Sequence, residues 1–124
     1  MGMTASGKTA TVTLWIATVL ETLAMAAAGL AKFVSPDLWT SWFVGWGYPA
    51  WMRPTIGSLE ILGALLLLVP AAAIGGAGLL IVIMGVALFT VLTNPDTLTW
   101  QAPVFHLTLL SVILWLRLAR RRAG

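Results

Sequence analysis

Four apolar runs, separated by short connections, constrain this chain more than any other feature. They cover residues 11–34, 54–69, 72–92 and 102–119. Each approaches the roughly 20 residues that an α-helix needs to cross a bilayer core. Pro70 divides the second run from the third, which together would be too long for one span. Because backbone polar groups in lipid must bond within their own segment, the pattern predicts an all-α integral membrane four-helix bundle.

The composition agrees with a membrane location. Hydrophobic residues make up 60% of the 124 residues, charged residues 9%, and the mean hydropathy is +0.97. An ordinary soluble domain is about one quarter charged. A chain of this length cannot hide so much apolar surface in its own core, so the lipid bilayer is its first expected partner.

The basic residues predict the orientation of the spans. Four of the seven lysines and arginines follow the last apolar run closely: Arg117, Arg120, Arg121 and Arg122. Next to a span, such a cluster marks the cytoplasmic side and does not indicate nucleic acid binding. We therefore expect both termini in the cytoplasm. A flexible tail would cover residues 1–10, a single four-span domain residues 11–119, and a basic tail residues 120–124.

An aromatic segment joins the first two runs. Ser35, Pro36 and Asp37 are typical of a helix start, and Gly45, Gly47 and Pro49 of its end. Aromatic residues between them recur at i, i+3, i+4 and i+7, which predicts a short amphipathic helix lying in the interface. Its anchors would be Trp39, Trp42, Phe43 and Trp46, with Trp51 after it. A platform for a lipid or quinone headgroup is the alternative, and the two interpretations are compatible.

Three ionisable side chains fall near the outer ends of the predicted spans. The helical rise places Lys32 ~3 Å, Glu60 ~8 Å and His106 ~5 Å below the outer boundary. Together with Thr90 they predict a polar pocket open to the outer leaflet, in which Lys32 and Glu60 form an ion pair. Such a pocket suits a quinone or another lipid-soluble molecule with a polar head. The structural alternative is that Lys32 reaches the headgroups, His106 bonds a neighbouring helix and Glu60 pairs with Lys32.

Glycines flank Glu60 in the pattern Gly57-x-x-Glu60-x-x-Gly63. Small residues on a membrane helix permit close approach of another helix. The pattern predicts that Glu60 faces the packed interior.

Glu21 lies deeper than the other ionisable residues, ~20 Å from the outer boundary. We expect no cationic partner for it at that depth. Ionisable groups inside a membrane usually mark a functional site. Glu21 is therefore a candidate for proton transfer or for contact with a partner.

The chain offers little for metal or thiol chemistry. It has no cysteine, which excludes disulfides and dithiol redox chemistry. One histidine and scattered carboxylates fall short of a usual ligand set, so no metal site is expected. No catalytic residue can be identified, and no cofactor is intrinsic to the chain. Any redox role must belong to a bound quinone or to a partner.

Two segments resemble the DoxX-like family of small four-helix membrane proteins. They are "GLAKF" (residues 29–33) and "GYPAWMRPTIGSLEILGALLLLVP" (residues 47–70). The positions that match the family pattern are Gly29, Lys32, Gly47, Pro49, Gly57, Glu60, Gly63 and Pro70. Where family members often have a basic residue after the proline that closes the second span, this chain has Ala71.

The resemblance implies a place beside quinone-linked oxidoreductases. Family members include the membrane part of a thiosulfate:quinone oxidoreductase and parts of complexes for oxidative stress. We expect a non-catalytic subunit of the bacterial inner membrane, quinone-associated or structural, with a redox subunit or a larger complex as partner. The alternative is a small homo-oligomeric transporter or lipid carrier that uses Glu21 and Glu60 as protonatable groups.

Overall fold

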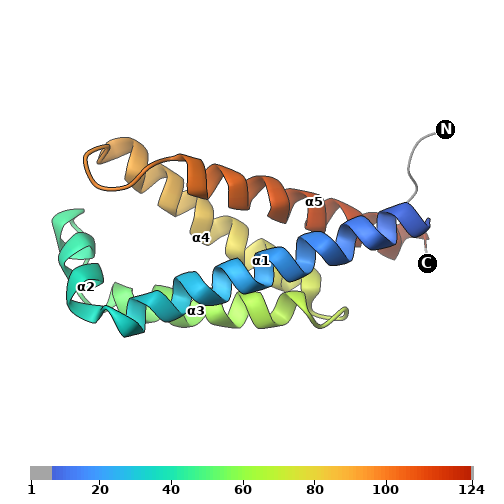
Figure 1. Ribbon diagram of the computed structural model, residues 1–124, viewed down its shortest axis with the longest axis horizontal. Coiled ribbons are helices and arrows are strands. Elements are labelled where there is room, and N and C mark those ends of the chain that lie inside the picture. The colour runs from blue at the N-terminus through green and yellow to red at the C-terminus, as the bar shows by residue number, and fades with distance from the viewer. Residues whose placement is uncertain (1–6, 124) are drawn as a thin grey trace.

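The computed structural model describes residues 7–123, and this part of the chain is helical throughout, without a β-strand. The helices are α1 (Lys8–Val34), α2 (Pro36–Gly45), α3 (Met52–Leu67), α4 (Ala73–Thr93) and α5 (Gln101–Ala123) (Figure 1). The predicted all-α class is confirmed, and so is a short helix between the first two long ones. Residues 1–6 of the predicted tail, and Gly124, lie outside the described residues.

The four long helices pack side by side. α1 contacts α3 and α5, and α4 contacts the same two helices. α1 begins and α5 ends at one end of the molecule, which we call the termini end (Figure 1). α2 stands across the opposite end, called the α2 end. Its N-cap position is occupied by Ser35, whose side chain makes no capping bond, and Pro36 opens the helix as predicted.

Three helices, α1, α4 and α5, are long and apolar enough to cross a membrane. α3 has 16 residues, or about 24 Å of helix, which is shorter than a hydrocarbon core of about 30 Å. The fourth span therefore stays a prediction. It depends on whether the turn after Leu67 completes the crossing.

The helices extend beyond the predicted domain borders. α1 begins at Lys8, and Ala10 is fully buried, so residues 8–10 belong to the packed helix and not to a tail. α5 continues through the arginines to Ala123. Arginine is a good helix former, and cations in a last turn interact favourably with the helix dipole.

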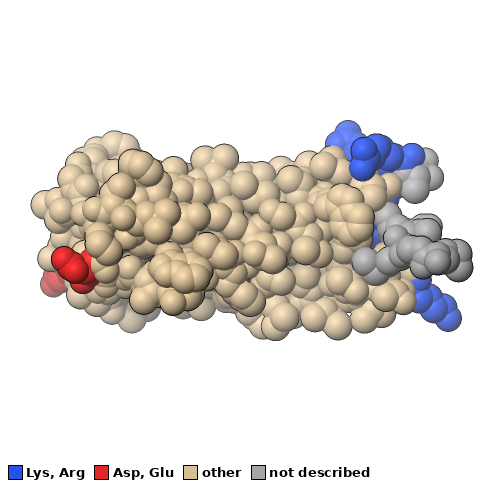
Figure 2. All heavy atoms as spheres, turned by 90° about the horizontal axis from the view of Figure 1, so that it is seen from above, with Lys and Arg blue, Asp and Glu red and all other residues tan. Residues whose placement is uncertain are grey.

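The core and the outer surface are both apolar. Leu14, Leu67, Leu80, Leu110 and Ile113 are fully buried, whereas many large hydrophobic side chains on the outside are more than half exposed, Leu23 and Val82 among them. Figure 2 shows the basic side chains gathered at the termini end and acidic side chains at the α2 end, with other residues between them. This distribution is the one expected of a membrane-spanning protein.

α1 and α3 cross at two glycines. A Cβ built on Gly29 would lie 2.6 Å from the carbonyl oxygen of Gly57, and one on Gly57 would lie 3.1 Å from the carbonyl oxygen of Gly29. A Cβ on Gly63 would lie 2.7 Å from Leu80 of α4. The glycine pattern around Glu60 therefore does mark a packed interior face, as predicted.

Candidate functional site

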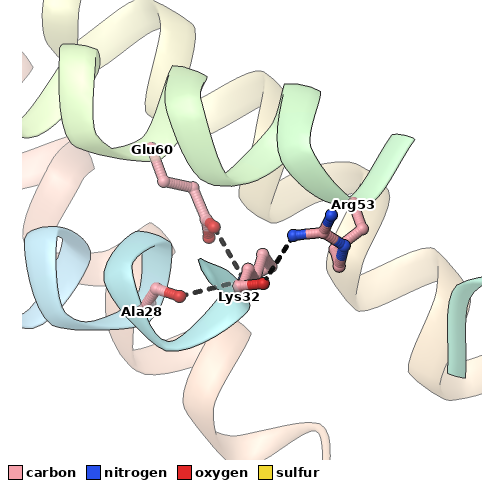
Figure 3. A network of polar contacts seen from close by, with 4 residues as sticks. All are labelled: Ala28, Lys32, Arg53 and Glu60. Carbon is pink, nitrogen blue, oxygen red and sulfur yellow. Dashed lines mark hydrogen bonds and ion pairs between the residues drawn. The ribbon is translucent and has the colours of Figure 1, made fainter. Parts of the chain in front are cut away.

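Lys32 and Glu60 form a buried ion pair between α1 and α3. Lys32 Nζ lies 2.7 Å from Glu60 Oε1, and the side chains are 7% and 2% exposed. The ammonium group also donates to the carbonyl oxygen of Ala28 at 3.3 Å (Figure 3). It lies 4.4 Å from the ring centroid of Trp39. The predicted pair is present, and both charges are enclosed.

Helix geometry explains why the two side chains meet. Cα–Cβ bonds in a helix lean toward its N-terminus. The two helices run antiparallel, so Lys32 leans toward the glycine crossing from one side and Glu60 from the other. Because Gly29 and Gly57 bring the backbones together, the charged groups reach each other without leaving the interface.

Arg53 completes the polar layer at the α2 end of α1. Its Nη1 donates to the carbonyl oxygen of Lys32 at 2.8 Å (Figure 3). Its Nε donates to Thr40 Oγ1 at 3.0 Å. A cation at the C-terminal end of a helix satisfies carbonyls that lack an intrahelical partner. Arg53 thereby ties α1, α2 and α3 together around Lys32.

The prediction that Glu21 lacks a cationic partner at its depth is wrong. His106 Nδ1 of α5 lies 2.6 Å from Glu21 Oε1 of α1. Glu21 is fully buried, and the side chain of His106 is 14% exposed. The other carboxylate oxygen of Glu21 is buried with no hydrogen-bond partner among the described residues.

The predicted depths of Glu21 and His106 were each counted from the predicted outer end of their own helix. Those ends do not lie at the same height along the bundle, so the two depths were not comparable. At the termini end, Arg120 donates a hydrogen bond to Thr11, so these two residues lie at a similar level of α5 and α1. Glu21 lies ten residues after Thr11, and His106 lies fourteen residues before Arg120. Counted from that contact, their depths differ by about 6 Å, not by about 15 Å. Two side chains can bridge that difference.

A cavity of about 320 Å³ gathers the predicted polar residues. It lies between the helices toward the α2 end. Its lining includes Lys32, Glu60, Thr90 and His106, the four residues predicted to share a pocket. Apolar walls surround them, formed among others by Met25, Ile56, Met84, Ala87 and Val91.

Part of the aromatic segment faces this cavity. Trp39, Phe43 and Trp46 line it, and Phe43 is buried. Trp46 Nε1 also donates to Thr97 Oγ1 at 3.0 Å, which links α2 to the α4–α5 connection. Trp42 and Trp51 do not line the cavity, and Trp51 is 64% exposed. α2 therefore covers the cavity, while interfacial anchoring by its tryptophans stays a prediction.

Sequence reasoning missed Tyr48. Its hydroxyl lies 2.6 Å from Thr90 Oγ1, and both residues line the cavity. Because Thr90 donates its own proton to the carbonyl oxygen of Val86 at 2.8 Å, Tyr48 is the donor of this bond. Gly47, with a φ of 92°, turns the chain back after α2 and places the tyrosine there. A lone tyrosine directly after a turn glycine was the available signal.

No group of three histidine, cysteine or acidic side chains that could hold a metal ion occurs within residues 7–123. The cavity offers an ammonium donor, an imidazole and a pair of hydroxyl oxygens instead. These groups bind carbonyl or hydroxyl oxygens of an organic molecule.

A model of the DoxX-like family matches residues 16–113. The chain belongs to the DoxX-like family. The match runs from α1 into α5 and covers the cavity of this DoxX-like membrane protein, including Lys32, Glu60, Thr90 and His106. No curated protein and no solved structure matches the chain.

Proposed function

We propose that this DoxX-like protein is the quinone-binding membrane subunit of an oxidoreductase assembly. The observation that carries the proposal is the cavity, in which apolar walls surround a small set of convergent polar groups. Sites for small organic ligands generally have this character. A quinone ring and tail suit the methionine and aliphatic walls, and its carbonyl oxygens suit the donors.

Two polar groups beside His106 are available to a quinone or quinol: an ammonium donor and a hydroxyl pair. Lys32 is held by Glu60 and Ala28 at one side of the interface. Tyr48 and Thr90 form a hydroxyl pair from the α2–α3 connection and from α4. Their protons go to Thr90 and to the Val86 carbonyl oxygen, so the Tyr48 oxygen can accept a hydrogen bond from a quinol hydroxyl. Because these groups are fixed by their own partners, they lose little conformational freedom when a ligand binds.

His106 is the proposed group for proton transfer. Its Nδ1 is held by Glu21, which leaves Nε2 for a ligand oxygen. The protonated ring can give the Nε2 proton to a quinone oxygen, and the neutral ring can accept one from a quinol hydroxyl. Glu21 stabilises the imidazolium in both directions and orients the ring.

A redox partner must supply or accept the electrons, because the chain has no cysteine and no other redox-active pair. We place the cavity toward the outer leaflet of a bacterial inner membrane, with both termini in the cytoplasm. The arginine-rich termini end supports this orientation (Figure 2).

The binding step can be tested with the purified chain in a neutral detergent. Trp39 and Trp46 line the cavity, so a short-chain benzoquinone should quench tryptophan fluorescence saturably. We expect Lys32→Met and His106→Gln each to weaken binding about tenfold, the loss of one good hydrogen bond. Ser58→Ala, on an exposed position of α3, is the matched control and should leave binding unchanged.

Quenching that rises linearly with quinone, and equally in all variants, would mean only partition into the micelle. That result would overturn the proposal. Co-purified quinone and a co-purified redox subunit from native membranes would support it.

A second function is favoured by one specific observation. Glu21 and Glu60 are both fully or almost fully buried, and each has a basic partner on another helix. Buried protonatable pairs are typical of proton-coupled transporters. Proteoliposomes loaded with a pH-sensitive dye distinguish the two functions. A proton flux that disappears in Glu21→Gln would favour transport over quinone binding.

A further inference from the structure

We propose that the termini end of α1 and α5 binds the phosphate of an anionic phospholipid. This inference is independent of the quinone proposal. It rests on residues toward the opposite end of the molecule, and its arginines lie outside the stretch that the family model matches.

Arg117 is the first element of the site. It is only 9% exposed, and its guanidinium carbon lies 5.2 Å from the ring centroid of Trp15 on α1. Its Nε and Nη2 are buried and have no hydrogen-bond partner among the described residues. The sequence placed Arg117 in the basic cluster after the last span, and the structure buries it against α1.

Arg120 lies one turn further along the same helix. Its Nη2 donates to Thr11 Oγ1, and its Nε is buried without a partner among residues 7–123. The two guanidinium groups therefore present three buried, unused nitrogen donors at one place on the α1–α5 interface. A buried donor without an acceptor raises the free energy of the folded state, and a buried charge without a counter-charge raises it further.

No acidic side chain within residues 7–123 serves these arginines. The chain has four acidic residues. Glu21 and Glu60 are already paired with His106 and Lys32. Asp37 opens α2 and Asp96 follows α4, so both lie toward the α2 end. The acidic side chains of the protein therefore leave this place open to an external anion. The planar guanidinium group matches the oxygens of a phosphate with paired donors.

An apolar groove continues from the arginines. Thr11 and Trp15, which contact Arg120 and Arg117, also line a shallow groove of about 540 Å³ along α1. Its remaining lining is Val12, Ile16, Val19 and Leu20. A phosphate on the guanidinium groups would thus have an apolar track beside it for one acyl chain. A free phosphate ion or an acidic peptide would leave that track unused.

The surrounding charge selects the headgroup. Lys8, Arg121 and Arg122 are exposed at the same end, which Figure 2 shows to be strongly basic. A zwitterionic lipid would bring its ammonium group into this field, whereas an anionic glycerol headgroup would not. Basic pockets between helix ends on the cytoplasmic side are known to suit anionic lipids.

The test is thermal unfolding of the full chain in neutral detergent with added short-chain phosphatidylglycerol. Ligand binding to the folded state raises the Tm. We expect a rise with phosphatidylglycerol and little with phosphatidylcholine of equal chain length. The double variant Arg117→Gln/Arg120→Gln should bind the anionic lipid at least about tenfold more weakly, because paired charge-assisted bonds are lost. The double variant Arg121→Gln/Arg122→Gln has the same net charge and should bind like the wild type.

Ile16→Trp provides a variant that leaves the arginines intact. It fills the exposed groove, and it should weaken lipid binding without lowering the Tm of the lipid-free protein. Equal loss in both double-arginine variants would mean non-specific charge attraction and would overturn the proposal. An equal Tm rise with inorganic phosphate would show a free-anion site. Displacement of the lipid by a co-purified acidic protein would show that the site is a protein interface.

Discussion

Glu21 and His106 are 85 residues apart in the sequence, and Oε1 of one lies 2.6 Å from Nδ1 of the other. The pair joins α1 to α5 in the interior and stands behind the cavity wall that His106 forms. Together with Lys32–Glu60 between α1 and α3, it gives α1 a buried polar link to each neighbouring long helix.

We predict that Glu21→Leu lowers the free energy of unfolding by about 3 kcal/mol, since it leaves His106 without its partner. The double variant Glu21→Leu/His106→Leu should be more stable than Glu21→Leu alone, because replacing both partners by apolar groups is often nearly neutral. Unfolding in mixed micelles measures both. If the loss in the double variant equals the sum of the losses in Glu21→Leu and His106→Leu, the two side chains have no interaction free energy.

Gly29→Ala should destabilise the protein by about 1–3 kcal/mol, because the new methyl group would overlap backbone in a tightly packed interface. It would lie 2.6 Å from the Gly57 carbonyl oxygen and 2.7 Å from Ile61 Cγ1. Gly85→Ala is the control, since no atom lies within 4 Å of its added Cβ. That change should stabilise α4 by about 0.5–1 kcal/mol. Similar effects at both glycines would contradict the close crossing.

Thr90→Val should cost about 1 kcal/mol of stability, because Tyr48 loses its acceptor. Thr93→Val is a closely matched comparison. Thr93 also donates to a carbonyl of its own helix, at 2.9 Å, but it is exposed and lies outside the cavity lining. We expect almost no change in that variant, measured by the same unfolding assay.

Single cysteines can test the topology, because the chain has none of its own. In intact cells a membrane-impermeant maleimide should label Asp96→Cys and should leave Arg122→Cys unlabelled until the membrane is opened. Ala71→Cys, between α3 and α4, decides whether the short α3 crosses. Protection like that of Arg122→Cys would establish the fourth span, whereas labelling like that of Asp96→Cys would exclude it.

The sequence by itself determined the membrane class, the positions of the helices and the α1–α3 contact. Hydropathy and helix-start signals such as Ser35–Pro36 depend only on neighbouring residues, so they can be recognised without knowledge of the tertiary contacts. The glycines around Glu60 could also be interpreted from the sequence. Glycine has no Cβ, so a helix face that carries glycines allows another helix to pack closely. The grouping of Lys32, Glu60, Thr90 and His106 followed from their common position near the outer helix ends.

Only the tertiary structure decided which polar groups pair across α1 and α5. The meeting of Glu21 with His106, and of Trp15 with Arg117, depends on how far one helix is shifted along the other. Packing at the interface sets that shift, and no periodicity within either helix encodes it. The contact of Tyr48 with Thr90 also depends on the tertiary structure. The positive φ of Gly47 changes the direction of the chain, but the position of α4 determines which side chain the tyrosine meets.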